Sequence, residues 1–569
     1  MRLVLLALFC FLTRLGYGQI FEPAIYPKGY FRNPLHIPID LAGNFGELRP
    51  NHYHMGFDLK TQHRQNLPVY AAAAGYIAKI KIEPAGFGRA IYINHPNGYT
   101  TVYGHLNAFT PALDAYLKAQ QYKLASWRVF LDIPPDLFPV KQGDFIAYSG
   151  NTGGSQGPHT HFEIRKTNDD INRNPMLFGF PLADNTRPTI SRLAVYDRRL
   201  SVYEQSPLLI PIKKTTDGYT TLLPVIIVTT PRISFAITAS DTHDGSTNPN
   251  GIFEAIIYDN GKPVVGFQMD KIGYDQTRNL NAHIDFKTRA TGGPFLQQLF
   301  QLPGYLNSIY KQAAGDGAID ISDGTVHHIQ IDVKDAYNNT SVLQTDVKYH
   351  WTFAGSPPHS QGKLFYPLMI DGFETDDCEF YMNEKCLYDS VHINYKKTTS
   401  FLPAAVSAVH SIGADYIPLQ EAMLVRIKPD TILDITKRNH IVMQWFAGKK
   451  NAVQKVEWQK DWAAAKWRMM GNFQLLLDEE APAIISVGFK NGANLSKAGK
   501  IVFIIKDNLG EFKNFHAELD GKWLRFTNDK GKSFVYIFDE KCARGEHSLK
   551  VSVEDEAGNV TTKVFKFLR

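Results

Sequence analysis

The stretch SGNTGGSQGPHTHFEIR, Ser149 to Arg165, places two histidines one residue apart directly after a glycine-rich turn. Successive side chains of a strand point to opposite faces of the sheet. If PHTHFEIR is a strand, His159 and His161 therefore share one face.

 The even-numbered side chains of the same strand, Thr160, Phe162 and Ile164, form the other face. The stretch predicts two imidazoles on one side of a strand and an apolar floor on its other side.

The segments around this stretch predict further short strands. Alternating apolar and polar residues, interrupted by Gly, Pro and Asn-Gly, run through VYAAAAGYIAKIKIEP, GRAIYINHPNGYTTVYGHL and VKQGDFIAYSG. Between them, PALDAYLKAQQYKLASWRVF carries apolar residues at helical spacing. We therefore expect a mainly β fold with a helical insertion at about residues 108–138.

Composition bounds the class of protein. A chain of 569 residues with 44% hydrophobic and 21% charged residues is typical of several soluble globular domains. Its net charge of +5 comes without a block of Lys and Arg, which argues against nucleic acid as a partner. No stretch after the first residues is long and apolar enough to span a membrane, so we expect no transmembrane segment in the mature chain.

The first residues, MRLVLLALFCFLTRLGYGQ, have the pattern of a secretory signal peptide. Arg2 precedes an apolar run, and Gly16 and Gly18 are small residues before a cleavage site, which we place after Gly18. An N-terminal membrane anchor is the alternative, but the run is short and Arg14 interrupts it. We therefore expect residues 1–18 to be removed and the chain to be exported, to the periplasm, the cell surface or the medium.

Two later parts of the chain resemble each other. DNTRPTI at 184–190 is similar to DEEAPAI at 478–484, and IDVKDAYNNTS at 331–341 is similar to VSVEDEAGNVT at 551–561. Strands at turn-delimited intervals within such repeats predict immunoglobulin-like β-sandwiches at 184–355 and 478–569. Residues 356–477, between them, form a β-rich module of no evident type.

The second pair of segments also shares a polar spacing. Asp335 and Asn339 are spaced like Asp555 and Asn559. Both residue types hydrogen-bond their own backbone, so the spacing fits a tight turn between strands. A bound ion is the alternative explanation.

Three cysteines follow the predicted signal peptide. Cys378 and Cys386 are close enough in the sequence to close a small loop in an oxidising compartment, and Cys542 would then remain. Whether that disulfide forms stays open, and none of the three lies in a metal-ligand pattern.

Four histidines and one aspartate lie in short glycine-marked contexts in the first third of the chain: His54, Asp58, His105, His159 and His161. Nitrogen and carboxylate ligands suit zinc, and a catalytic zinc site takes three protein ligands plus water. Five such residues exceed that number, which leaves two for acid–base work. The chain has no HExxH motif, so the helix-borne zinc protease arrangement is excluded.

HMGFD, YGHL and GPHTHFEI occur in this order, with VYAAAAGYI and VKQGDFIAYSGNTG between them. Together they resemble the lysostaphin-type (LytM-like) zinc metallo-endopeptidases, which cut the peptide part of the bacterial cell wall. The resemblance covers about residues 45–180 and implies a small β-roll or open-barrel peptidase domain, here placed at 19–183. It departs from the family's pattern in the long segment between His105 and Val140.

The resemblance also implies roles for the five residues. His54, Asp58 and His161 would bind Zn²⁺, while His105 and His159 would be catalytic and face the water that zinc activates. Which of the two histidines is the general base stays open. Glu163 falls on the same strand face as the histidines, where it can support the metal site or pair with Arg165.

These features predict an exported zinc endopeptidase that acts on peptidoglycan, with the downstream sandwiches contacting the wall or envelope proteins. A non-catalytic regulator of other wall hydrolases is the alternative, because the implied family includes members that have lost zinc ligands. A latent enzyme gated by the helical insertion is a variant of that alternative. Adhesion through the sandwiches explains the length of the chain but not the intact set of five residues.

Overall fold

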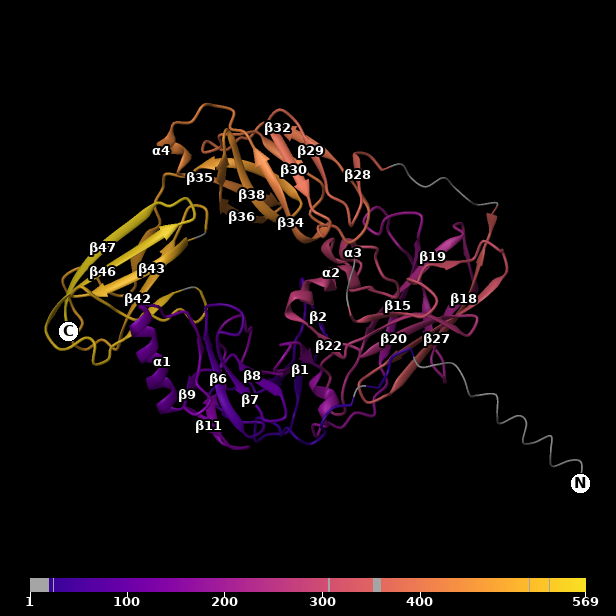
Figure 1. Cartoon of the computed structure of the whole chain (residues 1–569), viewed down its shortest axis with the longest axis horizontal. Coiled ribbons are helices and arrows are strands. Elements are labelled where there is room, and N and C mark those ends of the chain that lie inside the picture. Colours follow the sequence, from indigo (N-terminus) through magenta and orange to yellow (C-terminus); the bar gives the residue numbers. More distant parts are fainter. Residues whose placement is uncertain (1–19, 24, 305–307, 352–359, 511, 532) are drawn as a thin grey trace, which may run out of the picture. The chain divides into compact units, whose positions relative to one another are not determined.

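The structure is a computed structural model that describes residues 20–23, 25–304, 308–351, 360–510, 512–531 and 533–569 (Figure 1). The chain divides into two compact units. Unit 1 contains the described parts of Met1–Lys28, Phe45–Met55 and Met176–His359. Unit 2 contains Gly29–Asn44, Gly56–Pro175 and the described part of Ser360–Arg569. The predicted signal peptide, residues 1–18, lies outside the described residues.

The first part of unit 2 is built on one twisted sheet with the strand order β1-β4-β13-β8-β7-β6-β10, and β11 and β14 pair with β6 and β13. The same part of the chain also forms a small sheet with the strand order β5-β12-β9. The strands are β1 (Leu41–Gly43), β4 (Phe57–Lys60), β5 (Pro68–Tyr70), β6 (Gly75–Ile82), β7 (Arg89–Asn94), β8 (Tyr99–Gly104), β9 (Ala108–Phe109), β10 (Val129–Asp132), β11 (Pro139–Val140), β12 (Phe145–Tyr148), β13 (His159–Lys166) and β14 (Asn172–Arg173).

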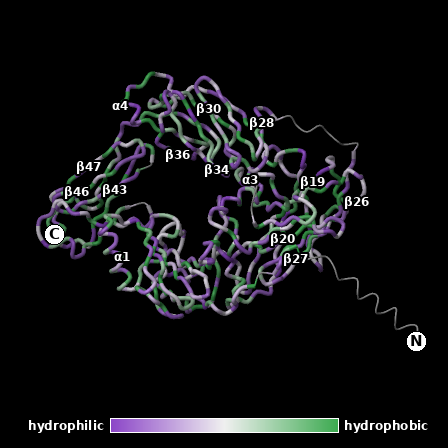
Figure 2. Tube along the Cα trace, viewed as in Figure 1, coloured by the Kyte–Doolittle hydropathy of each residue, from purple (hydrophilic) through white to green (hydrophobic). Residues whose placement is uncertain are grey.

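Alternation of apolar and polar residues explains why these segments are strands. Figure 2 shows hydrophobic and hydrophilic residues interleaved along them, as expected where one face of a strand packs against a core. On β13, Phe162 and Ile164 are completely buried, and Phe162 packs against Tyr103 of β8 with ring centroids 5.4 Å apart. The mainly β fold expected from the sequence is confirmed.

The helix of the expected insertion, α1, runs from Pro111 to Leu124. Thr110 caps its N-terminus by accepting a hydrogen bond from the Leu113 amide, and Ala125 ends it in the left-handed conformation. Strand β10 then begins at Val129 and pairs with β6. The helical region is therefore shorter than the expected 108–138, because the segment rich in β-branched and aromatic residues after Ser126 extends the sheet.

The later part of unit 2 begins with a pair of five-stranded sheets, β29-β30-β34-β38-β37 and β32-β33-β39-β35-β36, preceded by the pair β28-β31. The elements are β28 (Lys363–Phe365), β29 (Asp371–Glu374), β30 (Cys378–Met382), β31 (Val391–Ile393), β32 (Tyr395–Thr398), β33 (Val409–Ile412), β34 (Pro418–Ile427), α4 (Ile435–Arg438), β35 (Ile441–Ala447), β36 (Lys450–Lys455), β37 (Glu457–Gln459), β38 (Trp462–Met469) and β39 (Gly471–Leu477).

The C-terminal part of unit 2 consists of the sheets β40-β42-β45 and β41-β47-β46-β43-β44. Their inward-facing residues, among them Phe503 of β42 and Val551 of β46, belong to one hydrophobic core, so the two sheets form a sandwich. The strands are β40 (Ala483–Ser486), β41 (Ala493–Asn494), β42 (Lys500–Lys506), β43 (Phe512–Leu519), β44 (Lys522–Trp523), β45 (Phe534–Ile537), β46 (Glu546–Asp555) and β47 (Val560–Leu568).

Unit 1 contains the sheet β16-β15-β19-β23, with β25 paired to β19, and the sheet β17-β18-β27-β26-β20-β21-β24. The elements are β2 (Leu48–Arg49), β3 (His52–Tyr53), η1 (Pro175–Phe178), β15 (Thr189–Asp197), β16 (Leu208–Ile210), β17 (Ile212–Lys214), β18 (Tyr219–Val228), β19 (Arg232–Ser240), β20 (Glu254–Asp259), β21 (Lys262–Gln268), β22 (Lys271–Ile272), η2 (Tyr274–Asn279), α2 (Leu280–His283), α3 (Phe286–Ala290), β23 (Gln297–Gln298), β24 (Tyr310–Gln312), β25 (Ile319–Asp320), β26 (Val326–Lys334) and β27 (Thr340–Tyr349).

Two further sequence expectations concern cysteines and membranes. Cys378, Cys386 and Cys542 are buried free thiols, so the loop that Cys378 and Cys386 could have closed is held without a disulfide. The Cys386 thiol instead contacts the Asn383 side chain and the Ala422 carbonyl. Among the described residues, no helix has the length and apolar character needed to cross a membrane.

One buried histidine of unit 1 has an unusual environment. His283, at the end of α2, is completely buried, and its Nδ1 lies 2.7 Å from the Tyr310 hydroxyl. The Tyr310 hydroxyl donates to the Gln298 carbonyl, so it accepts from the His283 Nδ1–H. Nε2 of His283 is buried without a hydrogen-bond partner. Burial therefore lowers the pKa of His283 to about 3.

We expect this histidine to make the fold sensitive to acid. Because its folded pKa of about 3 lies below the unfolded value of 6.5, its contribution is complete above pH 6.5 and decreases as the pH falls toward 3. Between pH 7.5 and pH 5.0 the loss is about 2 kcal/mol of unfolding free energy. Urea unfolding followed by circular dichroism at the two pH values measures it.

A His283→Gln variant does not titrate at this position and is the matched control. It should lose less stability than the wild type between pH 7.5 and pH 5.0, whatever its stability at pH 7.5. Equal losses in the two proteins would show that other groups cause the acid sensitivity.

Candidate functional site

The site begins with the pairing of three neighbouring strands in unit 2. Strand β13 lies between β4 and β8, and His161 pairs directly with Asp58 of β4 on one side and with Gly104 of β8 on the other. Directly opposed residues of an antiparallel pair project to the same face, so Asp58 and His161 meet. The residue after Gly104 is His105. The register therefore brings Asp58 and His161 together on one sheet face, with His105 at the end of the neighbouring strand.

His161 is held from both of its ring nitrogens. Nδ1 lies 2.9 Å from Asp58 Oδ1, and Nε2 lies 3.0 Å from Glu163 Oε1. Burial alone would lower the pKa of His161, but the two carboxylates outweigh burial and raise its pKa to about 9. Nε2–H of His161 is donated to Glu163. Nδ1, which faces Asp58, is therefore the atom that can bind a metal ion.

Glu163 carries both functions that the sequence left open. Its side chain is completely buried, and while Oε1 accepts from His161, Oε2 accepts from Arg165 Nε at 2.8 Å. Arg165 also pairs with the exposed Asp170, at 3.1 Å. A carboxylate that accepts the second N–H of a histidine fixes its ring orientation and tautomer, which is the usual support of a metal-binding histidine.

His105 follows β8 in the left-handed conformation, with φ of 59°. Its Nδ1 donates to the Thr152 carbonyl at 2.9 Å, which leaves the lone pair on Nε2. Burial, followed by the nearby His159 and His161, lowers the pKa of His105 to about 3. The side chain is therefore a neutral imidazole at neutral pH, in a backbone conformation that non-glycine residues rarely adopt.

His159 lies beside His105, with ring centroids 4.7 Å apart. Its Nδ1 lies 2.9 Å from the Gly157 carbonyl and 3.1 Å from Ser155 Oγ, while Nε2 lies 3.3 Å from Asp58 Oδ1. Both histidines thus have Nδ1 tied to the segment before β13. In each, Nε2 is the nitrogen left to face the group formed around Asp58.

His54, Asp58 and His161 each offer one ligand atom, and these three atoms lie within 4.8 Å of one another. All three side chains are buried. Two imidazole nitrogens and one carboxylate oxygen match the donor set of a three-ligand zinc site, and the support of His161 by Glu163 fits a metal ligand. The group could therefore hold a metal ion, as the sequence predicted for these three residues.

Two glycines allow the strands to approach at the site. A Cβ added at Gly56 would lie 2.2 Å from the Phe162 carbonyl oxygen, which no packed structure tolerates. A Cβ at Gly104 would lie 3.1 Å from the Phe87 ring and 3.3 Å from the His161 Cβ. The glycine of HMGFD is therefore required by the close approach of β13, and the glycine of YGHL leaves room for Phe87 and His161 beside it.

Other side chains of the site were not foreseen from the sequence. The segment Ser149–Pro158, which we call the rim loop, supplies the Thr152 carbonyl to His105 and Ser155 Oγ to His159. The sequence predicts a glycine-rich turn here. It does not indicate which backbone carbonyls of the turn accept hydrogen bonds from the histidines. The glycines confirm their turn role: Gly153 has φ of 65°, and a Cβ there would lie 2.3 Å from the Gly88 nitrogen.

The rim loop is also contacted from the C-terminal sandwich, within unit 2. Asp529 accepts two hydrogen bonds from the Arg89 guanidinium, at 2.9 and 3.0 Å, and its carbonyl accepts from the Gly153 amide at 2.9 Å. Lys530 Nζ donates to the Ser155 carbonyl at 2.6 Å and to Asn151 Oδ1 at 3.1 Å. No local pattern in the sequence indicates these contacts.

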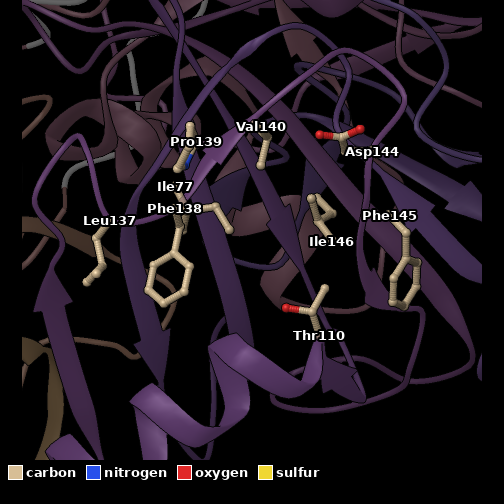
Figure 3. Close-up of a pocket in the computed structure, with 9 residues that line it drawn as sticks. All are labelled: Ile77, Thr110, Leu137, Phe138, Pro139, Val140, Asp144, Phe145 and Ile146. Atoms are coloured by element: carbon tan, nitrogen blue, oxygen red, sulfur yellow. The ribbon is translucent and has the colours of Figure 1, made fainter.

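A pocket of about 370 Å³ lies elsewhere in the same part of unit 2 (Figure 3). Its lining is mostly apolar, and Figure 3 shows the Phe138 and Ile146 side chains between Leu137 and Phe145. The one charged side chain that lines it, Asp144, accepts a hydrogen bond from the Lys141 amide. No predicted site residue lines this pocket, and it offers no group of reactive side chains.

Comparison with known proteins matches two segments to family descriptions. Residues 52–122 match the family described as "Peptidase family M23". Residues 369–478, most of the β-rich module to which the sequence assigns no type, match the family described as "Zu5-like domain".

Curated relatives resemble part of this chain. A protein of Haemophilus influenzae, described as an uncharacterized metalloprotease, is 32% identical over 154 residues, which are 26% of this chain and 26% of the relative. The DD-carboxypeptidase/endopeptidase Mpg of Neisseria meningitidis serogroup B is 29% identical over 175 residues, 30% of this chain and 31% of the relative. The chain thus spans about a quarter to a third of the length of these relatives.

Solved structures resemble the same share of the chain. The catalytic domain of lysostaphin from Staphylococcus simulans is 24% identical, with a TM-score of 0.18, and the match covers 24% of this chain and 87% of that one. The catalytic domain of the M23 protein EnpA from Enterococcus faecalis is 21% identical, with a TM-score of 0.19, covering 26% and 96%.

The contacts of Glu163 generate a prediction about metal affinity. A Glu163→Gln substitution removes the carboxylate that orients His161, so we expect the affinity for Zn²⁺ to fall about 10- to 100-fold. Competition with a chelator of known zinc affinity measures this change.

Asp170→Asn is the matched control, because Asp170 pairs with the same Arg165 but does not touch His161. It should leave zinc affinity unchanged. Thermal unfolding of both variants verifies that they fold, and an unchanged affinity in folded Glu163→Gln would contradict the supporting role of Glu163.

Proposed function

We propose that this chain, whose residues 52–122 match peptidase family M23, is an exported zinc metallo-endopeptidase that hydrolyses peptide bonds of bacterial peptidoglycan. The observation that carries the proposal is the group of His54, Asp58 and His161, with two further histidines beside it. A relative named as a DD-carboxypeptidase/endopeptidase supports the substrate class.

In this proposal His54, Asp58 and His161 hold Zn²⁺. Zinc supplies a Lewis acid that polarises a carbonyl and activates water at neutral pH. The chain contributes the donor set: Asp58 and His161 lie on paired strands, and Glu163 orients the His161 ring from behind. All three of these side chains are buried, which keeps bulk water from most of their surface.

His105 and His159 are the proposed catalytic residues. Each has Nδ1 hydrogen-bonded to a carbonyl of the rim loop, so each uses Nε2 to accept or donate a proton. The neutral state of His105, with the lone pair on Nε2, suits it to accept a proton. The rim loop therefore sets the orientation of both rings toward the metal ligands.

The remaining parts of the chain receive roles in the same proposal. We propose that residues 1–18 are a signal peptide that leads the chain to the periplasm or the cell surface. Residues 19–183 are the peptidase domain, and 184–355 and 478–569 are two immunoglobulin-like domains that contact the wall or envelope proteins. The two-sheet organisation of residues 478–569 around one core supports the last assignment.

The decisive experiment incubates purified peptidoglycan fragments with zinc-loaded protein from Gln19 onward and identifies new peptide termini by mass spectrometry. We expect cleavage by the unmodified protein. His161→Ala should lose both zinc and cleavage, whereas His105→Ala should retain zinc and lose about 100- to 10,000-fold in kcat/KM.

Measuring bound zinc in every sample separates the two variants. Failure of the zinc-loaded wild type to cleave any wall type would overturn the proposal in favour of a regulator of other hydrolases. Equal rates for wild type and His105→Ala would remove His105 from the catalytic set while leaving the metal site intact.

A further inference from the structure

Three buried carboxylates meet at one end of the two large sheets of unit 1. Asp184 precedes β15, Asp241 follows β19 and Asp335 follows β26. Each offers a carboxylate oxygen, and the three oxygens lie within 4.8 Å of one another. The first two belong to the β15–β19 sheet and the third to the sheet of β26, so the group lies where the two sheets come together. The three side chains are 9%, 4% and 2% exposed.

Hydrogen bonds leave oxygens of this group unused. Asp335 is well satisfied, because its oxygens accept from the amides of Tyr337 and Asn339 and from the Asn339 side chain. Oδ2 of Asp184 and Oδ1 of Asp241, in contrast, are buried and have no hydrogen-bond partner among the described residues. Unpaired buried acceptors are rare, because their desolvation is not compensated.

A neutral oxygen from outside the acidic group points to a ligand at the same place. Asn250 and Asp241 exchange both backbone hydrogen bonds, at 2.9 and 2.7 Å, as an isolated antiparallel bridge. Residues paired in this way project their side chains to the same side. The Asn250 side chain is 6% exposed, and its amide oxygen is also buried without a hydrogen-bond partner.

Electrostatics makes the group unstable as three bare anions. Burial, followed by Asp184 and Asp335, raises the pKa of Asp241 to about 8, and burial raises the pKa of Asp184 to about 6. No Lys or Arg pairs with any of the three in the described part of unit 1. A bound cation would compensate the charges and give the unpaired oxygens a partner.

We propose that Asp184, Asp241 and Asp335, together with the Asn250 amide oxygen, form a calcium site. All four donors are oxygens, which excludes a preference for zinc or other soft metals. Ca²⁺ accepts six to eight oxygen ligands in flexible geometry, including carboxylates and Asn carbonyls, whereas Mg²⁺ requires a near-ideal octahedron and retains several waters. The site is separate from the histidine group and does not depend on peptidase activity.

The second copy of the sequence repeat shows how the same turn looks without such a site. There Asp478, Asp507 and Asp555 take the places of Asp184, Asp241 and Asp335 relative to β40, β42 and β46. Both copies share the turn itself, because Asn559 bonds to the Asp555 side chain and the Asp478 carbonyl as Asn339 does to Asp335 and the Asp184 carbonyl.

The two copies differ in one neighbouring amide, although Asp507 Oδ1 is buried without a hydrogen-bond partner as Asp241 Oδ1 is. Asn508, next to Asp507, donates its side-chain N–H to Asp478 Oδ1 at 2.8 Å. In the first copy the residue next to Asp241 is Thr242, and Asp184 Oδ2 stays unpaired. The described carboxylates of the second copy do not form a group of three oxygens as close as those of the first. We expect calcium at the first copy alone.

The test is calorimetric titration of CaCl₂ into the zinc-loaded chain from Gln19 onward, together with thermal unfolding in calcium and in calcium-free buffer. The wild type should bind one Ca²⁺ per chain, and its Tm should rise with calcium because the ion binds the folded state. Asp241→Asn should weaken binding by about 100-fold or more, because affinity follows the charge of the ligands. Asp507→Asn, the matched change in the second copy, should leave binding unchanged.

The same melting curves test whether the variants fold. In calcium-free buffer, Asp241→Asn should melt at or above the Tm of the wild type, because it places no third carboxyl in the buried group, whereas in calcium the order should reverse. The proposal is overturned if the wild type takes up no calcium at millimolar concentration. It is equally overturned if Asp241→Asn binds calcium as the wild type does, since the ion would then lie elsewhere.

Discussion

The register between β13 and its two neighbours is the constraint on which the site depends. His161 pairs with Asp58 on one side and with Gly104 on the other. Two strands that are far apart in the sequence therefore place Asp58, and the residue that precedes His105, beside one imidazole. A slip of one residue would turn Asp58 to the opposite face of the sheet. Phe162 and Ile164 prevent such a slip, since they are completely buried on the opposite face. The apolar floor of the strand thus determines the geometry of the polar residues above it.

Much of this arrangement could be predicted from the sequence, because period-two alternation determines the shared face of His159 and His161, and the glycine-marked motifs indicate tight approaches. The end of α1 could not, because the same aromatic and β-branched residues suit a helix face or an edge strand, and pairing with β6 decides between them. The contact of Asp241 with Asp184 was also beyond prediction, because a single aspartate after a strand has no pattern. The immunoglobulin-like assignment and the signal peptide stay predictions.

The two copies of the repeat show how one backbone plan carries different polar chemistry. The turn after the long hairpin strand is the same in both, with an aspartate that accepts from the amide four residues later. What differs is whether the carboxylate that begins the copy receives a side-chain N–H. In the second copy Asn508 supplies it, and in the first no equivalent donor reaches Asp184 Oδ2. Asp507 Oδ1 stays without a hydrogen-bond partner as Asp241 Oδ1 does, so the two copies differ in the partner of the first carboxylate and in how closely the three carboxylates approach.

Asp529 and Lys530 join the C-terminal sandwich to Arg89 and the rim loop by hydrogen bonds. The rim loop, which orients His105 and His159, is hydrogen-bonded by Lys530, a residue that the ribosome adds 379 positions after Asn151. Up to that moment in synthesis, Arg89 lacks its carboxylate and the rim loop lacks its lysine. The last sandwich therefore forms part of the surroundings of His105 and His159, because the turn that holds Asp529 and Lys530 hydrogen-bonds Arg89 and the rim loop.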